Sequence, residues 1–268
     1  MKRVFKILPF LLFTLTLSFA QENPGARQVA LSHADVALTA DPFSLFNNPA
    51  GLAEINSNSI GIYYSPSPFG LKELSNGFGV TSQPTSFGTL SGGFMIYGFE
   101  LYKETKLTLG LGKKFANNFS FGISTTYKNI SIKNYGAKGF IILNAGGIAE
   151  LSRNINIGFS LENFTRTTIN NEENQIPVVF WTGISYKVLD ELQLFAALKK
   201  EISYNVSFRF GAEYFLLDFL QLRFGTANEP DTYSGGIGIN YKMLQLDYAV
   251  SSHHLLGLTH QFGLIISF

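Results

Sequence analysis

The sequence contains no cysteine and few charged residues, and it lacks a long apolar segment beyond its first twenty residues. Only 15% of the 268 residues are charged, against roughly 25% in an ordinary soluble domain. The absence of cysteine excludes a disulfide scaffold, and no later run approaches the roughly 18–20 apolar residues of a membrane helix. The 26 Phe and 12 Tyr exclude a disordered chain. The net charge of +1 gives no reason to expect a nucleic-acid partner.

The N-terminus has the pattern of a secretory signal. A positively charged start at residues 2–6 precedes the apolar run Ile7–Phe19, and small residues lie at the cleavage positions. We therefore expect residues 1–20 to be a signal peptide and the mature chain to start at Gln21. An uncleaved anchor helix would need a longer apolar core. No cysteine follows the cleavage site, so a lipoprotein is not expected.

From about residue 57 onward, apolar and polar residues alternate with a period of two, which is the pattern of β-strands with two different faces. In one such segment the apolar positions are Ile155, Ile157, Phe159 and Leu161. Many segments reach the roughly 9–11 residues with which a tilted strand crosses a bilayer. About fourteen strands are predicted, at 57–65, 76–83, 86–98, 104–115, 118–131, 138–151, 154–165, 177–188, 191–201, 203–215, 219–227, 232–242, 244–252 and 257–268.

The connections between these strands alternate between short turns and generally longer polar segments, as in outer-membrane barrels. Short turns are expected at Ala116-Asn117, Ser152-Arg153, Leu189-Asp190, Leu216-Asp218 and Lys242-Met243, and longer connections at 132–137, 166–176, 228–231 and 253–256. Outward aromatic residues gather near strand ends, as in an interfacial girdle: Tyr127, Tyr186, Tyr214 and Tyr241.

These patterns predict an all-β fold, a transmembrane antiparallel β-barrel over residues 57–268 in the bacterial outer membrane. A soluble β-sandwich or propeller can also alternate apolar and polar positions. The polar face here is rich in Gly, Ser, Asn and Thr with few charges, as in a lumen, whereas the other face carries Phe, Tyr, Leu and Ile on nearly every strand. The barrel is therefore favoured.

Residues 21–56 do not alternate and are too few for a second domain. Small residues dominate this segment, and Pro49 and Gly51 enforce a turn. We expect it to be a hatch, a plug packed on the lumen face of the barrel. Inward glycines in Gly110-Leu111-Gly112 and Gly235-Gly236-Ile237-Gly238 would let the hatch backbone approach the wall.

Motifs near both ends of the mature chain point to a known family. The hatch contains Gly25-Ala26-Arg27, Val36-Ala37, Asp41-Pro42 and Asn48-Pro49-Ala50-Gly51-Leu52-Ala53, and the C-terminal part contains Glu213-Tyr214, Leu220, Leu222, Arg223, Gly225, Leu246-Asp247-Tyr248-Ala249, His253, Leu256-Gly257, Thr259-His260 and Phe268. Together they resemble the PorV/PorQ group of outer-membrane proteins, related to the FadL long-chain fatty-acid transporters. The resemblance implies a fourteen-stranded barrel with an N-terminal hatch. Ser32-His33-Ala34 and Ala40-Asp41 depart from the family pattern of Gly-Gly-Ala and Asp-Asp.

Several charged side chains face the lumen by strand parity. They include Lys128, Glu150, Glu162 and Lys187, and above all Arg209, Glu213, Arg223 and Asp247. They could form a polar constriction that selects solutes or a clamp for the hatch. They could instead simply pair with one another and fill the barrel wall, and this second interpretation is favoured. Arg27 is expected to pair with Glu213 or Asp247.

No catalytic, cofactor or metal site is expected. The four histidines are His33, His253, His254 and His260, and a metal site would need convergent ligands and a second shell of hydrogen bonds. Serine is abundant, yet no histidine is grouped with a nucleophile in a recognisable elbow. The chain is therefore interpreted as a non-enzyme.

Two functions from different classes remain. The resemblance implies a barrel associated with type IX-like protein secretion or with scaffolding at the outer membrane. The alternative is FadL-like passive transport of hydrophobic small molecules. The expected partners are outer-membrane lipid, the barrel assembly machinery, and either secretion components or hydrophobic small molecules. The C-terminal Phe268 is expected to be the signal that the assembly machinery recognises. The polar loop at 166–176 disfavours fatty-acid capture, and the short outer loops leave little surface for a large cargo. A third reading is a paralogue with neither role.

Overall fold

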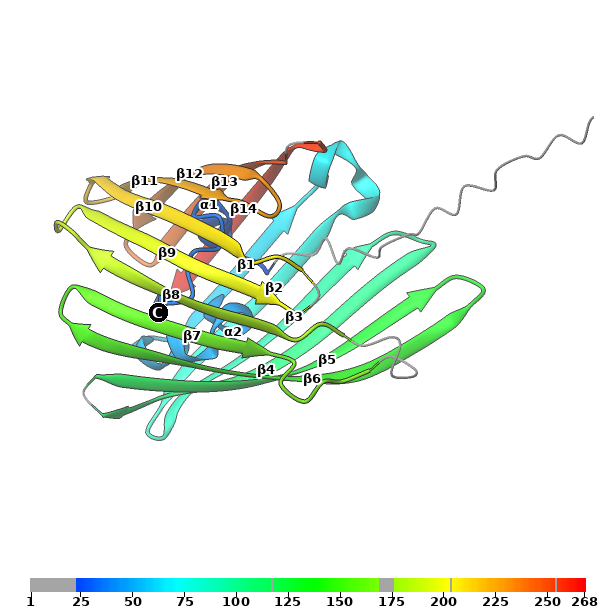
Figure 1. Ribbon diagram of the computed structural model, residues 1–268, viewed down its shortest axis with the longest axis horizontal. Helices are drawn as coiled ribbons and strands as arrows, with labels where there is room; N and C mark the ends of the chain where they lie inside the picture. The colour runs from blue at the N-terminus through cyan, green and yellow to red at the C-terminus, as the bar shows by residue number, and fades with distance from the viewer. Residues whose placement is uncertain (1–22, 117, 169–175, 203, 254) are drawn as a thin grey trace, which may run out of the picture.

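The computed structural model describes residues 23–116, 118–168, 176–202, 204–253 and 255–268. These residues form a closed antiparallel barrel with the N-terminal segment inside it (Figure 1). Each strand pairs with its neighbours in the sequence, and the last strand pairs with the first to close the barrel. The strands are β1 Ser59–Ser65, β2 Asn76–Thr85, β3 Gly88–Gly98, β4 Tyr102–Ala116, β5 Phe119–Ile132, β6 Gly136–Ser152, β7 Ile155–Glu162, β8 Val179–Lys187, β9 Leu192–Glu201, β10 Ser207–Leu217, β11 Leu220–Ala227, β12 Thr232–Tyr241, β13 Leu244–His253 and β14 Gly257–Ser267.

The predicted fourteen-stranded barrel is confirmed, and each predicted strand overlaps one observed strand. The main difference in bounds is at β10, which was predicted to begin at residue 203 and begins at Ser207. Tyr204 belongs to the preceding connection, where its carbonyl accepts a hydrogen bond from Lys200 Nζ at 2.6 Å. A further connection between β1 and β2, residues 66–75, contains two short 3-10 helices, η2 Pro68–Gly70 and η3 Lys72–Leu74. Of the predicted loop 166–176, residues 169–175 lie outside the described residues.

The two ends of the barrel differ. At one end, called the turn end here, lie the short turns, the start of β1 and Phe268; at the other, called the loop end, lie the connections that precede the even-numbered strands. Strands β4, β5 and β6 are the longest, and their hairpins extend beyond the neighbouring wall at the loop end (Figure 1).

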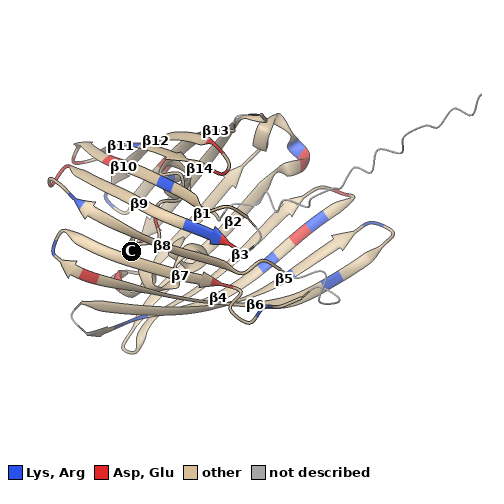
Figure 2. Ribbon diagram, in the orientation of Figure 1, with Lys and Arg blue, Asp and Glu red and all other residues tan. Residues whose placement is uncertain are grey.

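The outer surface of the barrel is apolar. Large side chains such as Leu107, Leu109 and Phe210 are more than half exposed on it, and charged residues are sparse along the wall (Figure 2). Tyr186, Tyr214 and Tyr241 face outward near the turn end. A chain that exposes an apolar band on a closed sheet, with no free edge to solvate, has the features of a membrane barrel. The described residues include no helix that is both long and apolar enough to cross a membrane.

The hatch, described here from residue 23, contains the helices α1 Ala26–Ala30 and α2 Ser44–Asn47 and the 3-10 helix η1 Pro49–Glu54. Asn48 begins η1 as its N-cap, because its side-chain oxygen accepts from the Ala50 N–H at 3.2 Å. Pro49 suits the first position of this turn, where its missing N–H is not needed. Gly25, which precedes α1, has a φ of 117°, a backbone conformation that would be strained in a residue with a side chain.

Two apolar clusters hold the hatch in the lumen. The first joins α1, α2 and η1 to β1–β3, β13 and β14, and its buried members include Phe43, Leu45 and Met95. The second joins the segment between α1 and α2 to β8 and β9, through Val36 and Trp181 among others. Burial of these side chains against the wall supplies the stability that such short helices cannot supply alone.

Candidate functional site: the hatch and the lumen around it

The hatch approaches the wall of the barrel on every side. Helix α1 contacts β11–β14 and η1 contacts β3–β6. Val36 lies against inward glycines of β7 and β8, and Phe43 and Phe46 reach β1 and β2. The wall provides this close approach by presenting glycine: a Cβ on Gly122 would lie 2.1 Å from the carbonyl carbon of Pro49, so backbone meets backbone there.

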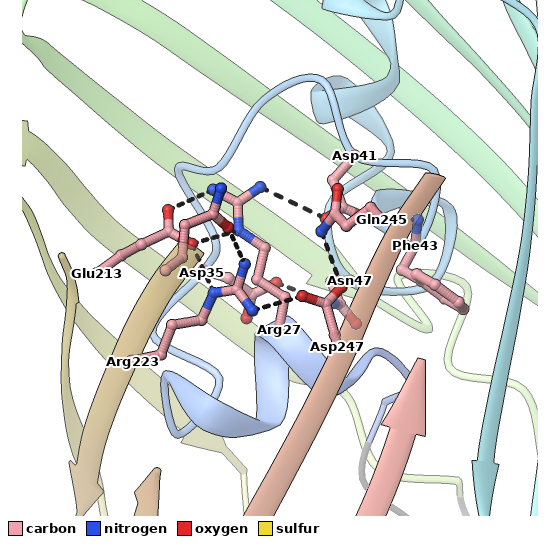
Figure 3. A network of polar contacts seen from close by, with 10 residues as sticks. Arg27, Asp35, Asp41, Phe43, Asn47, Glu213, Arg223, Gln245 and Asp247 are labelled. Carbon is pink, nitrogen blue, oxygen red and sulfur yellow. Dashed lines mark hydrogen bonds and ion pairs between the residues drawn. The ribbon is translucent and has the colours of Figure 1, made fainter. Parts of the chain in front are cut away.

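A buried network of charged side chains fastens the α1 side of the hatch (Figure 3). Arg27 donates to both oxygens of Glu213 on β10, from Nε at 3.0 Å and from Nη2 at 2.6 Å. Arg223 on β11 donates to the same carboxylate from Nε at 2.6 Å. Its Nη1 donates to Asp247 on β13 at 2.5 Å. One guanidinium from the hatch and one from the wall therefore share Glu213.

Neutral side chains complete this network. Gln221 accepts from Arg223 Nη2 at 2.5 Å, and Gln245 donates to Asp247 at 2.8 Å. Glu213 and Arg223 are 0% and 1% exposed. Charged groups this deeply buried are tolerated only when they are paired and hydrogen-bonded, as they are here.

Asp41 joins the network from the hatch itself. Its carboxylate lies 3.7 Å from Arg27 Nη1 and accepts from the Phe43 N–H at 2.9 Å. Burial raises the pKa of Asp41, and the positive charge of Arg27 acts in the opposite direction. Burial by itself would lower the pKa of the Arg27 guanidinium. The charge and hydrogen bonds of the Glu213 carboxylate outweigh burial, so this pKa is raised. The hatch arginine is thus held in its charged form.

A second group of polar side chains lines an open cavity between the hatch and strands β7–β10. The wall contributes Glu162, Trp181, Lys199 and Arg209 to it. Trp181 Nε1 donates to Glu162 at 3.0 Å, and Arg209 Nη1 donates to the Ser32 carbonyl of the hatch at 2.9 Å. This cavity lies toward the loop end, because these four residues lie near the loop ends of their strands.

An aromatic group lies on the other side of the lumen, against β1–β3. Phe46 of α2 meets Phe78 edge to face with ring centroids 5.4 Å apart, and Tyr63 meets the same ring at 5.8 Å. Met95 is 1% exposed beside them. Aromatic rings and a flexible thioether therefore fill this side of the lumen as a packed apolar cluster.

The structure brings together the charged residues that parity had placed in the lumen. Arg27, Glu213, Arg223 and Asp247 belong to one network, whereas Arg209 lies apart from it at the cavity. The hatch motif residues Gly25, Ala26, Asp41, Asn48, Pro49 and Gly51 all lie inside the barrel, and all are buried. Residues 1–22, which hold the expected signal peptide, lie outside the described residues.

The other lumen charges have local partners. Lys128 pairs with Glu104 at 2.7 Å across β4 and β5. Glu150 and Lys187 lie near the turn end, where Lys114 and Asp190 are their partners at 3.7 Å and 2.7 Å. The sequence analysis did not name Glu104, Trp181, Lys199, Asp35 or Asn47. Trp181 could have been found, since it is the chain's one tryptophan and lies on the lumen face by parity.

No group of three or more potential metal ligands converges in the described part of the chain. His33 is buried in the hatch and lines the cavity. His260 faces outward on β14, where Nδ1 lies 2.7 Å from the Tyr248 hydroxyl. His253 lies at the end of β13, with its ring 5.8 Å from that of Phe69, and His254 lies outside the described residues.

Comparison with known proteins finds the fold among solved structures only. No protein-family model matches the sequence, and no curated protein matches it. The toluene transporter TbuX of Ralstonia pickettii is similar at a TM-score of 0.68 and 13% identity, over 93% of this chain and 98% of that one. A FadL homologue of Pseudomonas aeruginosa is similar at a TM-score of 0.66 and 12% identity, over 92% of this chain and 98% of that one. The toluene transporter TodX of Pseudomonas putida is similar at a TM-score of 0.65 and 11% identity, over 92% of this chain and 98% of that one.

The fold is that of the FadL-type barrels. The similarity covers nearly all of both chains, so it includes the hatch as well as the wall. Together with the apolar outer surface and the closed sheet, this fold places the chain in the bacterial outer membrane.

Proposed function

We propose that this barrel passes hydrophobic small molecules across the bacterial outer membrane. The observation that carries the proposal is the arrangement of the lumen, in which a hatch touches the wall on every side, packs on an aromatic cluster at β1–β3 and leaves an open cavity beside β7–β10. The same fold occurs in the toluene transporters TbuX and TodX. Neighbours of this kind are transporters, which supports a non-enzymatic role.

Passage through such a lumen requires the hatch to move. The two sides of the hatch are fastened differently. Besides its apolar packing, α1 is held by charged side chains, through Arg27 and Glu213, whereas packing and backbone contact at Gly112 and Gly122 hold η1. Water that enters the lumen can solvate separated charges, but it cannot replace lost packing. The α1 side is therefore the side that releases.

An uptake assay tests the proposal. Cells that lack the chain are expected to take up toluene more slowly than cells that carry it, with secretion of surface proteins intact. A small polar solute serves as the control, since a general leak would speed its uptake as well. Equal toluene uptake with and without the chain would overturn the proposal.

A scaffold in protein secretion is the second candidate. It rests on the resemblance to the PorV/PorQ group, and the feature that favours it is the β3–β6 wall that extends beyond the rest of the barrel at the loop end (Figure 1). Loss of surface-protein secretion on deletion, with toluene uptake unchanged, would support this role and not the first. Phe268, which ends the chain after β14 and is 59% exposed, is proposed as the signal for the barrel assembly machinery.

A further inference from the structure

Two consecutive residues at the end of α1 have a left-handed backbone. Ser32 has a φ of 50° and His33 a φ of 55°. These conformations favour glycine, because the Cβ of any other residue comes too close to the following carbonyl oxygen. Strain of this kind persists only where the surrounding structure holds it, and it gathers in segments that switch conformation. Ser32 and His33 are called the joint here.

Hydrogen bonds from α1 hold the joint in this conformation. The Ser32 N–H donates to the Val29 carbonyl at 2.9 Å and the His33 N–H to the Gln28 carbonyl at 2.8 Å. This is the pattern of a Schellman motif, whose left-handed position is usually a glycine. Rotation about the φ of Ser32 keeps the first bond, whose atoms precede the rotation, and breaks the second.

The barrel wall holds the joint as well. Arg209 Nη1 on β10 donates to the Ser32 carbonyl at 2.9 Å, and the hydroxyls of Ser32 and Ser234 on β12 lie 2.6 Å apart. A Cβ on Gly225 of β11 would lie 2.5 Å from the Ser32 nitrogen, so the backbone of the joint meets the backbone of the wall. The joint is thus a fixed point from which the chain runs in two directions.

The chain that follows the joint is tied to α2 and η1. The Asn47 side-chain amide donates to the Asp35 carboxylate at 2.7 Å. The Asn48 side-chain amide donates to the Val36 carbonyl at 2.6 Å. These bonds join residues 35–54 into one unit, called the anchored part here.

The anchored part and α1 are held to the wall by different contacts. A Cβ on Gly158 of β7 would lie 2.3 Å from the Val36 carbonyl oxygen, and Gly122 allows the same close approach at η1. Helix α1 has apolar packing and the bonds from Arg27 to Glu213. Water can solvate this ion pair once it separates, but it cannot replace the close packing of backbone on backbone.

We propose that α1 rotates away from β11–β14 about the joint while the anchored part stays docked, so that the barrel opens without releasing the whole hatch. This inference deepens the proposed function and rests on it, because passage requires release of α1. The left-handed joint favours the movement, since Ser32 and His33 return to negative φ once α1 has left. Ala34 follows the joint directly and shares an apolar cluster with Leu31, so the same movement uncovers it.

Two valines provide matched reporters of the two parts. Val29 on α1 is 3% exposed and Val36 on the anchored part is 4% exposed. Val29→Cys and Val36→Cys are made separately in the full-length barrel, which has no other cysteine, and are labelled with a water-soluble thiol reagent in non-ionic detergent. The thiol on α1 should react at least about tenfold faster, and adding Arg27→Gln should raise its rate alone.

Variants of His33 test the joint itself. His33→Gly and His33→Ala both remove the imidazole and its contacts, so they differ chiefly in how readily the backbone adopts a positive φ. Alanine strains the docked position and glycine does not. Labelling of Val29→Cys should therefore be about fivefold faster with His33→Ala than with His33→Gly, whereas labelling of Val36→Cys should be the same with both. The circular dichroism of the strands confirms that each variant has folded.

Equal labelling at the two valine positions, or an equal rise at both with Arg27→Gln, would show that the hatch leaves as one unit and would overturn the proposal. Equal labelling of Val29→Cys with His33→Gly and His33→Ala would overturn the role of the joint. Toluene uptake by cells is measured separately, so the proposed function has its own outcome. Faster labelling of α1 without any toluene uptake would contradict the proposed function and retain the movement about the joint.

Discussion

Replacing Arg27 with glutamine would remove the charge by which the hatch holds β10. The side chain donates two charge-assisted hydrogen bonds to Glu213, at 3.0 Å and 2.6 Å, and lies 3.7 Å from Asp41. Removing one partner of a buried ion pair costs roughly 3–5 kcal/mol. Glu213 keeps Arg223 as a partner, so the lower end applies, about 3 kcal/mol. Since each 1.4 kcal/mol is about tenfold in an equilibrium constant, the undocked fraction of the hatch should rise about 100-fold.

The absence of cysteine from the chain gives a clean assay for this fraction. Ala34 in the hatch is 0% exposed, and Ala34→Cys would place a single thiol there that reacts with a water-soluble reagent only when the hatch has left its site. If docking is fast compared with labelling, the labelling rate follows the undocked fraction. Arg27→Gln should therefore speed labelling about 100-fold.

Asp190→Asn provides the control, since it removes an exposed ion pair between Lys187 and Asp190 at the turn end. Such pairs contribute roughly 0–1 kcal/mol, and this one does not touch the hatch, so labelling should stay the same. A labelling rate in Arg27→Gln within threefold of the parent, with the barrel still folded, would refute the assignment of the network as the fastening of α1.

Three further changes have expected outcomes. Gly122→Ala places a Cβ 2.1 Å from the Pro49 carbonyl carbon, so the thiol of Ala34→Cys should be labelled faster while the barrel still folds. Gly235→Ala is its control: the added Cβ would lie 3.6 Å from its nearest atom and should leave the labelling rate unchanged. Asn48→Ala removes the cap of η1 and the 2.6 Å hydrogen bond to the Val36 carbonyl, and should cost about 2 kcal/mol of hatch docking, read as an increase in the same rate. Deletion of Phe268 should lower the amount of folded barrel in the outer-membrane fraction, whereas an unchanged amount would exclude it as an assembly signal.

The strands and the direction of their side chains could be predicted because a membrane barrel imposes a period of two on every crossing. Glu213, Arg223 and Asp247 were placed in the lumen by this parity alone. Arg27 was expected to pair with Glu213 or Asp247, since a charge inside a barrel needs a partner, and the structure pairs it with Glu213.

The cavity at Trp181 could not be predicted in the same way. Parity gives the face on which a side chain lies, but not which residues of neighbouring strands stand at one height. That depends on the register between strands, such as Trp181 opposite Lys199 and Ser160. The hatch residues Asp35 and Asn47 reach the cavity only through the path of the hatch, which packing against the wall determines. Helices of four and five residues have no stability of their own from which to predict that path.

The most direct test of hatch-controlled passage uses a reversible lock. Ala26 of α1 and an added Cβ at Gly263 of β14 would lie 3.2 Å apart, slightly closer than the roughly 3.5–4.5 Å of a disulfide, so the pair Ala26→Cys and Gly263→Cys needs only a small shift to close. Toluene uptake is measured in cells that carry this double variant, before and after reduction. The account predicts that uptake is at the level of cells without the barrel when the disulfide is closed, and that reduction restores it. Equal uptake in both states, above that of cells without the barrel, would contradict passage that depends on release of the α1 side of the hatch.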